Sequence, residues 1–311
     1  PYLGRGAHDG KEGNLAYHNS LMVQFWSALA ARDTSLMTHV LSTHFPTVLR
    51  NATYATYIRC HDDIGWAITE EDAEAVGVTG PGHRDFLSDF YEGSFPGSFS
   101  SGVLFGVNDQ TGDKRISGSL ASLAGLEKAL AAGDDTAIDL AVQRILMGHA
   151  LIAAYGGVPL IYMGDEIATL NDYGYREVEE EASDSRWVHR PRMDWDSVDR
   201  IRRGDTATPE GRVWHGLQAI FARRKATAEI HAAHPVRVPD APDGAVFALV
   251  HEAPTGPLLC LFNFSEEPVA IGGDWAISQG IKSFHDALSD LPVQLHDGNI
   301  LLPPYGRFWL R

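Results

Sequence analysis

Apolar side chains recur at helical spacing in three stretches of the chain. The first stretch carries its apolar residues on one face at 3.6 residues per turn and predicts a buried helix: Leu21, Met22, Phe25, Trp26 and Leu29. The same spacing predicts a helix over 138–153, which Gly156-Gly157 would end, and another over 213–221. Residues 1–14 are rich in glycine, have no apolar period and predict a loop.

Two short runs of aromatic, β-branched and aliphatic residues, 54–60 and 158–163, predict buried strands. Acidic residues follow both runs, in His61-Asp62-Asp63 and in Gly164-Asp165-Glu166. The step from the helix at 138–153 to the second run resembles one α/β unit of a parallel sheet. Irregular patterning over 66–132 predicts an inserted subdomain, and residues 167–208 predict a charged loop.

A change of pattern near the C-terminal quarter predicts a second domain. Pro235, Pro239 and Pro242 mark a boundary. Beyond it, strand-like runs alternate with turn residues, as in a small antiparallel β-sandwich: 245–250, 258–264, 268–271, 282–287, 299–302 and 308–310.

Composition and charge exclude several classes of protein. The chain has 311 residues, 44% of them hydrophobic, which is enough for a large core and excludes disorder. The formal net charge of -16 disfavours nucleic acid and anionic membranes as partners. No apolar run reaches the roughly 20 residues of a membrane span. Cys60 and Cys260 are 200 residues apart, and we expect two reduced, buried thiols.

Histidines and acidic runs give no metal-site pattern. His231 and His234 lie three apart and His83 lies near Asp85, but no trio has a ligand spacing, so we expect no metal and no cofactor. The run 177–181 lacks the alternation of a calcium loop. Aromatic residues between 86 and 105 could stack on sugars, but we expect at least half of them to form the core of the insert.

The two strand ends are candidate functional sites. Adjacent carboxylates beside an imidazole, as in His61-Asp62-Asp63, disturb one another's pKa unless a ligand or cation shares them. The alternative for either strand end is structural, because acidic residues after a strand often cap a helix or bind loop amides. An isolated His-Asp pair favours this alternative.

A longer set of motifs favours a functional site at these strand ends over the structural alternative. The string 57–66, Tyr-Ile-Arg-Cys-His-Asp-Asp-Ile-Gly-Trp, resembles the strand-seven signature of the α-amylase superfamily of glycoside hydrolases, most closely its amylosucrase branch. Further motifs agree in order: 112–118, 157–166, 170–172 and 184–192. The similarity runs from about residue 14 to the end of the chain.

The resemblance implies an α/β fold. It implies the C-terminal part of a (β/α)8 TIM barrel with an inserted subdomain after strand seven, followed by an all-β sandwich domain. The implied divisions are a barrel part with strand seven at 1–65, the insert at 66–132, the barrel end at 133–234 and the sandwich at 235–311.

The resemblance also implies an activity, that of a retaining sucrose glucosyltransferase that extends an α-glucan and releases fructose. Two carboxylates about 5–5.5 Å apart flank the bond in such enzymes, and a third assists. Asp62 is implied to be the assisting carboxylate and His61 a donor to glucosyl hydroxyls. Arg186 is implied at the floor of the glucose pocket, where it would pair with an aspartate from elsewhere in the barrel. The acceptor or fructosyl side would be lined by Asp63, Arg84 and Arg115.

Nothing in the chain matches the nucleophile aspartate or the acid/base glutamate of the family, which follow strands four and five. We therefore expect the N-terminal barrel half to be missing here and this chain alone to be inactive. We expect sucrose and α-glucan as substrates and the cytoplasm as the compartment. The alternatives are a sucrose hydrolase of the same family and a non-catalytic carbohydrate-binding module.

Overall fold

A computed structural model describes residues 3, 8, 11–45, 49, 51–108, 110 and 112–311. The chain forms two compact units. The first unit comprises Pro1–Ile58, Met147–Leu160 and Ala219–Arg311, and the second comprises Arg59–Leu146 and Ile161–Gln218. Two helices, α7 (Asp135–Ala154) and α9 (Pro209–Ala226), contribute residues to both units.

The first unit holds a parallel three-stranded sheet in the order β1-β2-β5. Its strands are β1 (Leu15–Tyr17), β2 (Thr53–Thr56) and β5 (Val158–Pro159). The predicted strands at 54–60 and 158–163 are therefore present but shorter than expected. The last bond of this ladder runs from Leu160 N to Thr56 O (2.8 Å), and the chain leaves the sheet beyond it.

Two helices of the first unit follow β1 along the chain, α1 (Asn19–Ala31) and α2 (Ser35–His44). The predicted helix around 21–29 is α1, and Trp26 Nε1 in it donates to Ile58 O (2.7 Å). Gly148 of α7 permits close packing here, because a Cβ at this position would lie 2.8 Å from Phe25 Cζ and 2.9 Å from Ile58 Cδ1. The end of the segment after β2 is thus fixed by packing against α1 and α7.

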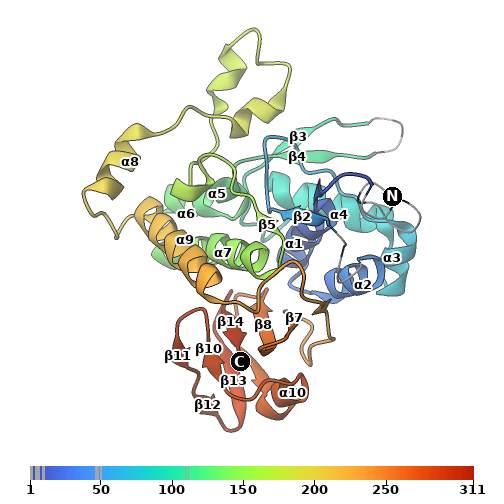
Figure 1. Ribbon diagram of the computed structural model, residues 1–311. Helices are drawn as coiled ribbons and strands as arrows, with labels where there is room; N and C mark the ends of the chain where they lie inside the picture. The colour runs from blue at the N-terminus through green and yellow to red at the C-terminus, as the bar shows by residue number, and fades with distance from the viewer. Residues whose placement is uncertain are drawn as a thin grey trace. The chain divides into compact units, whose positions relative to one another are not determined.

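Two antiparallel sheets form the C-terminal part of the first unit (Figure 1). The six-stranded sheet has the order β11-β10-β14-β8-β7-β6, and the three-stranded sheet has the order β12-β13-β9. The strands are β6 (Val236–Arg237), β7 (Val246–Ala253), β8 (Gly256–Asn263), β9 (Val269–Gly272), β10 (His285–Asp286), β11 (Leu291–Pro292), β12 (Leu295–His296), β13 (Asn299–Leu302) and β14 (Arg307–Leu310). Each of the six predicted strand runs overlaps one of these strands, and a short helix, α10 (Gly273–Ser278), interrupts the β structure.

The two antiparallel sheets share one core. Val246 and Leu261 of the larger sheet and Ile271 and Ile300 of the smaller sheet belong to the same buried cluster. The other face of the larger sheet is covered too, since Phe264, directly after β8, contacts Phe25 of α1 at 5.8 Å between ring centroids. Burial on both faces explains why β7 and β8 read as continuous apolar runs.

The second unit is built around short helices and one antiparallel hairpin. Its helices are α3 (Glu70–Ala75), α4 (Gly80–Glu92), α5 (Leu120–Leu123), α6 (Leu126–Ala132) and α8 (Trp195–Arg202). The hairpin pairs β3 (Val103–Phe105) with β4 (Arg115–Ser117). In its core Trp66 stacks on Tyr91 at 5.6 Å between ring centroids and donates from Nε1 to Ser88 Oγ (2.9 Å). Residues 167–208, predicted as a loop, contain α8 and two short 3₁₀ helices, Tyr173–Glu177 and Ser185–His189.

Helix α7 is long and apolar enough to cross a membrane by length and composition. However, 72% of its most apolar stretch is buried inside the structure, which is usual for a helix of a protein core.

Candidate functional site

The run from His61 to Ile64 is fixed to the hairpin of the second unit by its backbone. Ile64 N donates to Ile116 O (2.7 Å), and Ile116 N donates back to Ile64 O (3.0 Å). These two bonds form an isolated antiparallel bridge beside β4. The bridge places the adjacent carboxylates of Asp62 and Asp63 next to the hairpin.

Arg186 joins two carboxylates. Its Nη1 donates to Asp62 Oδ1 (2.9 Å), while its Nε and Nη2 donate to Asp184 Oδ1 and Oδ2 at 2.9 Å each. Burial acts to raise the pKa of Asp62, but hydrogen bonds from Arg186 and from Asp63 N outweigh it and lower that pKa to about 2. Half of the Asp62 side chain is exposed, so an ionised carboxylate faces solvent here.

Asp63 lies in a different environment from its neighbour. Its side chain is buried and pairs with Arg115 Nη1 at 3.4 Å. Burial raises the pKa of Asp63, and the hydrogen bond and negative charge of Asp62 raise it further. The two adjacent carboxylates therefore have pKa values shifted in opposite directions, as is common in sites of acid/base chemistry.

The backbone carbonyl of His61 is held by two side chains of the segment after Asp184. Arg190 donates to this oxygen from Nε (2.9 Å) and Nη2 (2.6 Å), and His189 Nε2 lies 3.2 Å from it. His189 Nδ1 accepts from Gly118 N (3.1 Å), so a neutral imidazole carries its proton on Nε2 and donates it to His61. Burial lowers the pKa of His189 to about 3, which keeps the ring neutral.

A buried ion pair connects the two predicted strand ends. Arg59 donates to Asp165 Oδ1 from Nε (3.2 Å) and Nη2 (2.9 Å), and both side chains are almost fully buried. The guanidinium also lies over the Tyr162 ring at 4.5 Å. Burial raises the pKa of Asp165 to about 6 in spite of the charge of Arg59. Asp165 therefore acts as a structural partner of Arg59.

The predicted site residues divide into two groups. His61, Asp62, Asp63, Arg115 and Arg186 lie along the contacts described above. Arg84 of α4 has other partners, because it donates to Ile68 O (2.9 Å) and pairs with Asp113 at 3.6 Å.

Three residues that hold the site were not singled out from the sequence. Asp184, His189 and Arg190 orient Arg186 and His61. The available signal was the motif at 184–192, where an aspartate precedes an arginine by two residues and allows an Asx turn, seen here as Asp184 Oδ1 accepting from Arg186 N (3.0 Å). His189 and Arg190 contact the His61 carbonyl, which lies 128 and 129 residues away in sequence, so local patterns alone do not identify these two residues.

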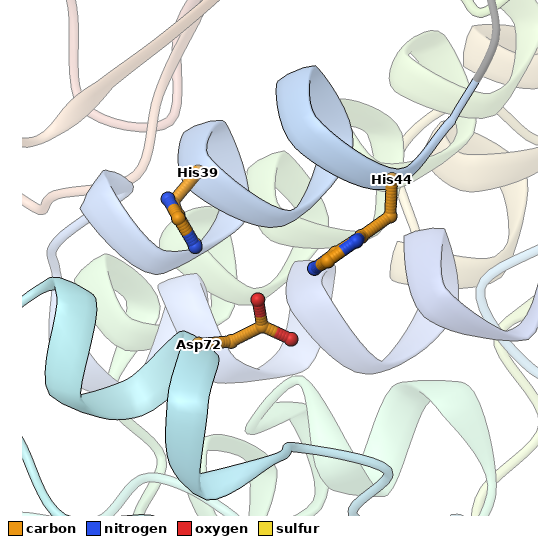
Figure 2. A group of neighbouring side chains, drawn as sticks. All are labelled: His39, His44 and Asp72. Carbon is orange, nitrogen blue, oxygen red and sulfur yellow. The ribbon is translucent and has the colours of Figure 1, made fainter.

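Further titratable side chains lie on helices of each unit. Figure 2 shows His39 and His44 on α2. Their ring centroids are 6.3 Å apart. At the start of α3, the N-cap residue Thr69 donates its hydroxyl to Asp72 Oδ2 (2.7 Å). Asp72 N donates to Thr69 Oγ1, which caps the helix.

Comparison with known proteins gives one family match. Residues 236–311 match the family described as "Amylosucrase, C-terminal domain". This range contains all the strands of the two antiparallel sheets.

Three solved structures have a similar fold. Sucrose 6F-phosphate phosphorylase from Thermoanaerobacter thermosaccharolyticum has a TM-score of 0.54 and 15% identity over 80% of this chain and 43% of that one. AmyP in complex with maltose has a TM-score of 0.54 and 14% identity over 99% of this chain and 51% of that one. The cyclic α-maltosyl-(1→6)-maltose hydrolase from Arthrobacter globiformis has a TM-score of 0.51 and 13% identity over 97% of this chain and 45% of that one.

These comparisons confirm the resemblance predicted from the motifs. Residues 236–311 carry an amylosucrase-type C-terminal domain, and the chain shares the fold of the matching parts of these three solved structures. It spans about half the length of the structures that it matches.

Proposed function

We propose that this chain belongs to a retaining sucrose glucosyltransferase that transfers glucose from sucrose to an α-glucan and releases fructose. The amylosucrase-type domain at 236–311 supports the branch of the family. In this proposal the nucleophile and the acid/base come from barrel segments outside these 311 residues, and Asp62 is the third carboxylate.

The observation that carries the proposal is the contact between Arg186 and Asp62. An ionised carboxylate can accept hydrogen bonds from sugar hydroxyls and stabilise the positive charge of an oxocarbenium-like transition state. The low pKa of Asp62, caused mainly by Arg186 against the effect of burial, keeps it charged throughout the physiological pH range. A guanidinium fixed by a second carboxylate, Asp184, gives the site a donor of fixed orientation.

The exposed apolar residues of the parallel sheet support further barrel strands as its proposed partner. Leu15 and Tyr17 on β1 and Val158 on β5 are each more than half exposed, although parallel sheets are normally buried on both faces. β1 and β5 are the outer strands of this sheet. In the proposal, further parallel strands of the same enzyme pair with these edges and cover the apolar side chains.

The test is fructose release from sucrose by the complete enzyme. Asp62→Asn keeps the size of the side chain and removes its charge, and we expect kcat to fall by about a hundredfold or more. Asp139→Asn is the matched control, because Asp139 is exposed in the same unit and pairs with Arg212; we expect its turnover to match that of the unchanged enzyme. Full turnover in the Asp62→Asn enzyme would refute the role of this carboxylate.

Product analysis separates the alternatives. The proposal expects α-glucan beside fructose, a sucrose hydrolase gives free glucose, and a non-catalytic module binds carbohydrate without releasing fructose. An unchanged complete enzyme that releases no fructose from sucrose would overturn the proposed function.

A further inference from the structure

The β3–β4 hairpin contacts both segments that carry the site. On one side, the Ile64–Ile116 bridge joins β4 to the His61–Ile64 run. On the other side, Ser185 Oγ donates to Leu104 O of β3 (3.1 Å), which joins the hairpin to the segment that carries Arg186. The hairpin is therefore the common support of Asp62 and Arg186.

One residue pair of this hairpin contacts both Asp63 and the Arg186 guanidinium. Phe105 of β3 and Arg115 of β4 are directly opposite in the antiparallel register, and opposite residues share a face of a sheet. The guanidinium of Arg186 lies over the Phe105 ring at 4.7 Å, and Arg115 pairs with Asp63. Arg186 is thus held by two different kinds of contact, the carboxylate of Asp184 and an aromatic face.

We infer that Phe105 is a positioning residue for sucrose binding, which holds the Arg186 guanidinium against Asp62 through a cation–π contact. This inference rests on the proposed function. Phe105 supports the plane of the guanidinium, while Asp184 binds its Nε and Nη2 atoms. With both contacts present, Nη1 stays directed at Asp62.

The kinetic test compares variants at position 105 in the complete enzyme. Phe105→Ala should raise KM for sucrose about two- to tenfold, the range of one cation–π contact, with a smaller change in kcat. Phe105→Tyr should restore KM because it keeps the ring, and Phe105→Leu should not, although it keeps much of the apolar volume. Phe95→Ala is the matched control, since Phe95 is 40% exposed in the same unit and contacts Phe86 and Phe90; we expect no change in KM.

A double-mutant cycle separates positioning from general packing. Combined with Arg186→Lys, Phe105→Ala should have a smaller effect than in the unchanged enzyme, because residues in contact do not act additively. Independent effects of the two substitutions, or a Phe105→Leu enzyme with the original KM, would overturn the inference.

A measurement without substrate distinguishes failure of this inference from failure of the proposed function. In a ¹³C NMR titration of the Asp62 carboxyl, identified by its loss in Asp62→Asn, Phe105→Ala should move the pKa of Asp62 upwards toward its ordinary value because Arg186 is less fixed. Phe95→Ala should not move it. An unmoved titration in Phe105→Ala would refute the positioning role whether or not sucrose is the substrate.

Discussion

His189 should make the stability of the protein depend on pH in a way that a single substitution removes. The imidazole is buried and neutral between Gly118 N and the His61 carbonyl, and burial lowers its pKa from 6.5 to about 3. In the unfolded chain the ring binds a proton near its ordinary pKa, so the unfolded state gains protons first as the pH falls. The stabilising effect of the neutral ring is complete above about pH 6.5 and is lost progressively toward about pH 3.

The magnitude follows from the size of the shift. Each pH unit between the two pKa values costs about 1.4 kcal/mol, so acidification from about pH 7.5 to about pH 5 removes roughly 2 kcal/mol through this residue. His189→Gln keeps a donor and an acceptor but does not titrate. At about pH 7.5 we expect the variant to be less stable by about 1–3 kcal/mol, because a more flexible side chain forms the two bonds less well.

The assay is urea unfolding followed by tryptophan fluorescence at several pH values. The difference in the free energy of unfolding between the unchanged protein and His189→Gln should be smaller by roughly 2 kcal/mol at about pH 5 than at about pH 7.5. Burial also lowers the pKa of His18 and of His251, but both residues are present in each protein and cancel in the comparison. His296→Gln is the control, at an exposed position of β12. Its free energy of unfolding should change with pH as that of the unchanged protein does. If the difference in free energy of unfolding between His189→Gln and the unchanged protein stays constant or grows on acidification, the neutral His189 ring is not the cause of the pH dependence.

Two substitutions test packing and hydrogen bonding in the first unit. Gly157→Ala should lower the free energy of unfolding by at least about 2 kcal/mol, because its Cβ would lie 2.3 Å from the Tyr54 carbonyl oxygen. The control Gly133→Ala, in the second unit, meets nothing within 4 Å and should cost only about 1 kcal/mol, the strain of an alanine at a positive φ of 63°. Equal melting temperatures for the two variants would contradict this. Asp286→Asn should lower the free energy of unfolding by about 1–3 kcal/mol. The buried carboxylate accepts hydrogen bonds from the backbone N–H groups of Leu288, Ser289 and Trp309, and the amide nitrogen of asparagine cannot accept them. An unchanged melting temperature would contradict this prediction.

The sequence predicts elements whose burial follows a simple period. Helices α1 and α7 and the strands of the C-terminal sheets have continuous apolar faces, so their positions follow from the spacing of apolar residues. Helix α2 was not predicted, since Ser35, Thr38 and Ser42 interrupt its pattern and only Leu36, Met37, Val40 and Leu41 are apolar and buried. Tertiary contacts, such as Thr34 Oγ1 with Gly244 O (3.0 Å), hold the start of this helix.

The candidate site depends on pairings that no local pattern contains. Asp62 and Arg186 are 124 residues apart, and their expected proximity came from the family motifs. The β3–β4 hairpin consists of two three-residue strands, too short for a periodic signal, and its register decides that Phe105 and Arg115 are opposite each other. Arg84, implied only by the resemblance, pairs with Asp113 and donates to Ile68 O.

The bridge between Ile64 and Ile116 has an evolutionary consequence. It closes residues 65–115 into a loop whose two ends are bonded to each other directly beside Asp62. A closed loop can gain or lose residues at little entropic cost, about 0.6 kcal/mol for each doubling of its length. Insertions between these two isoleucines can therefore reshape the surroundings of the carboxylates during divergence while the spacing of Asp62 and Asp63 from β4 stays fixed.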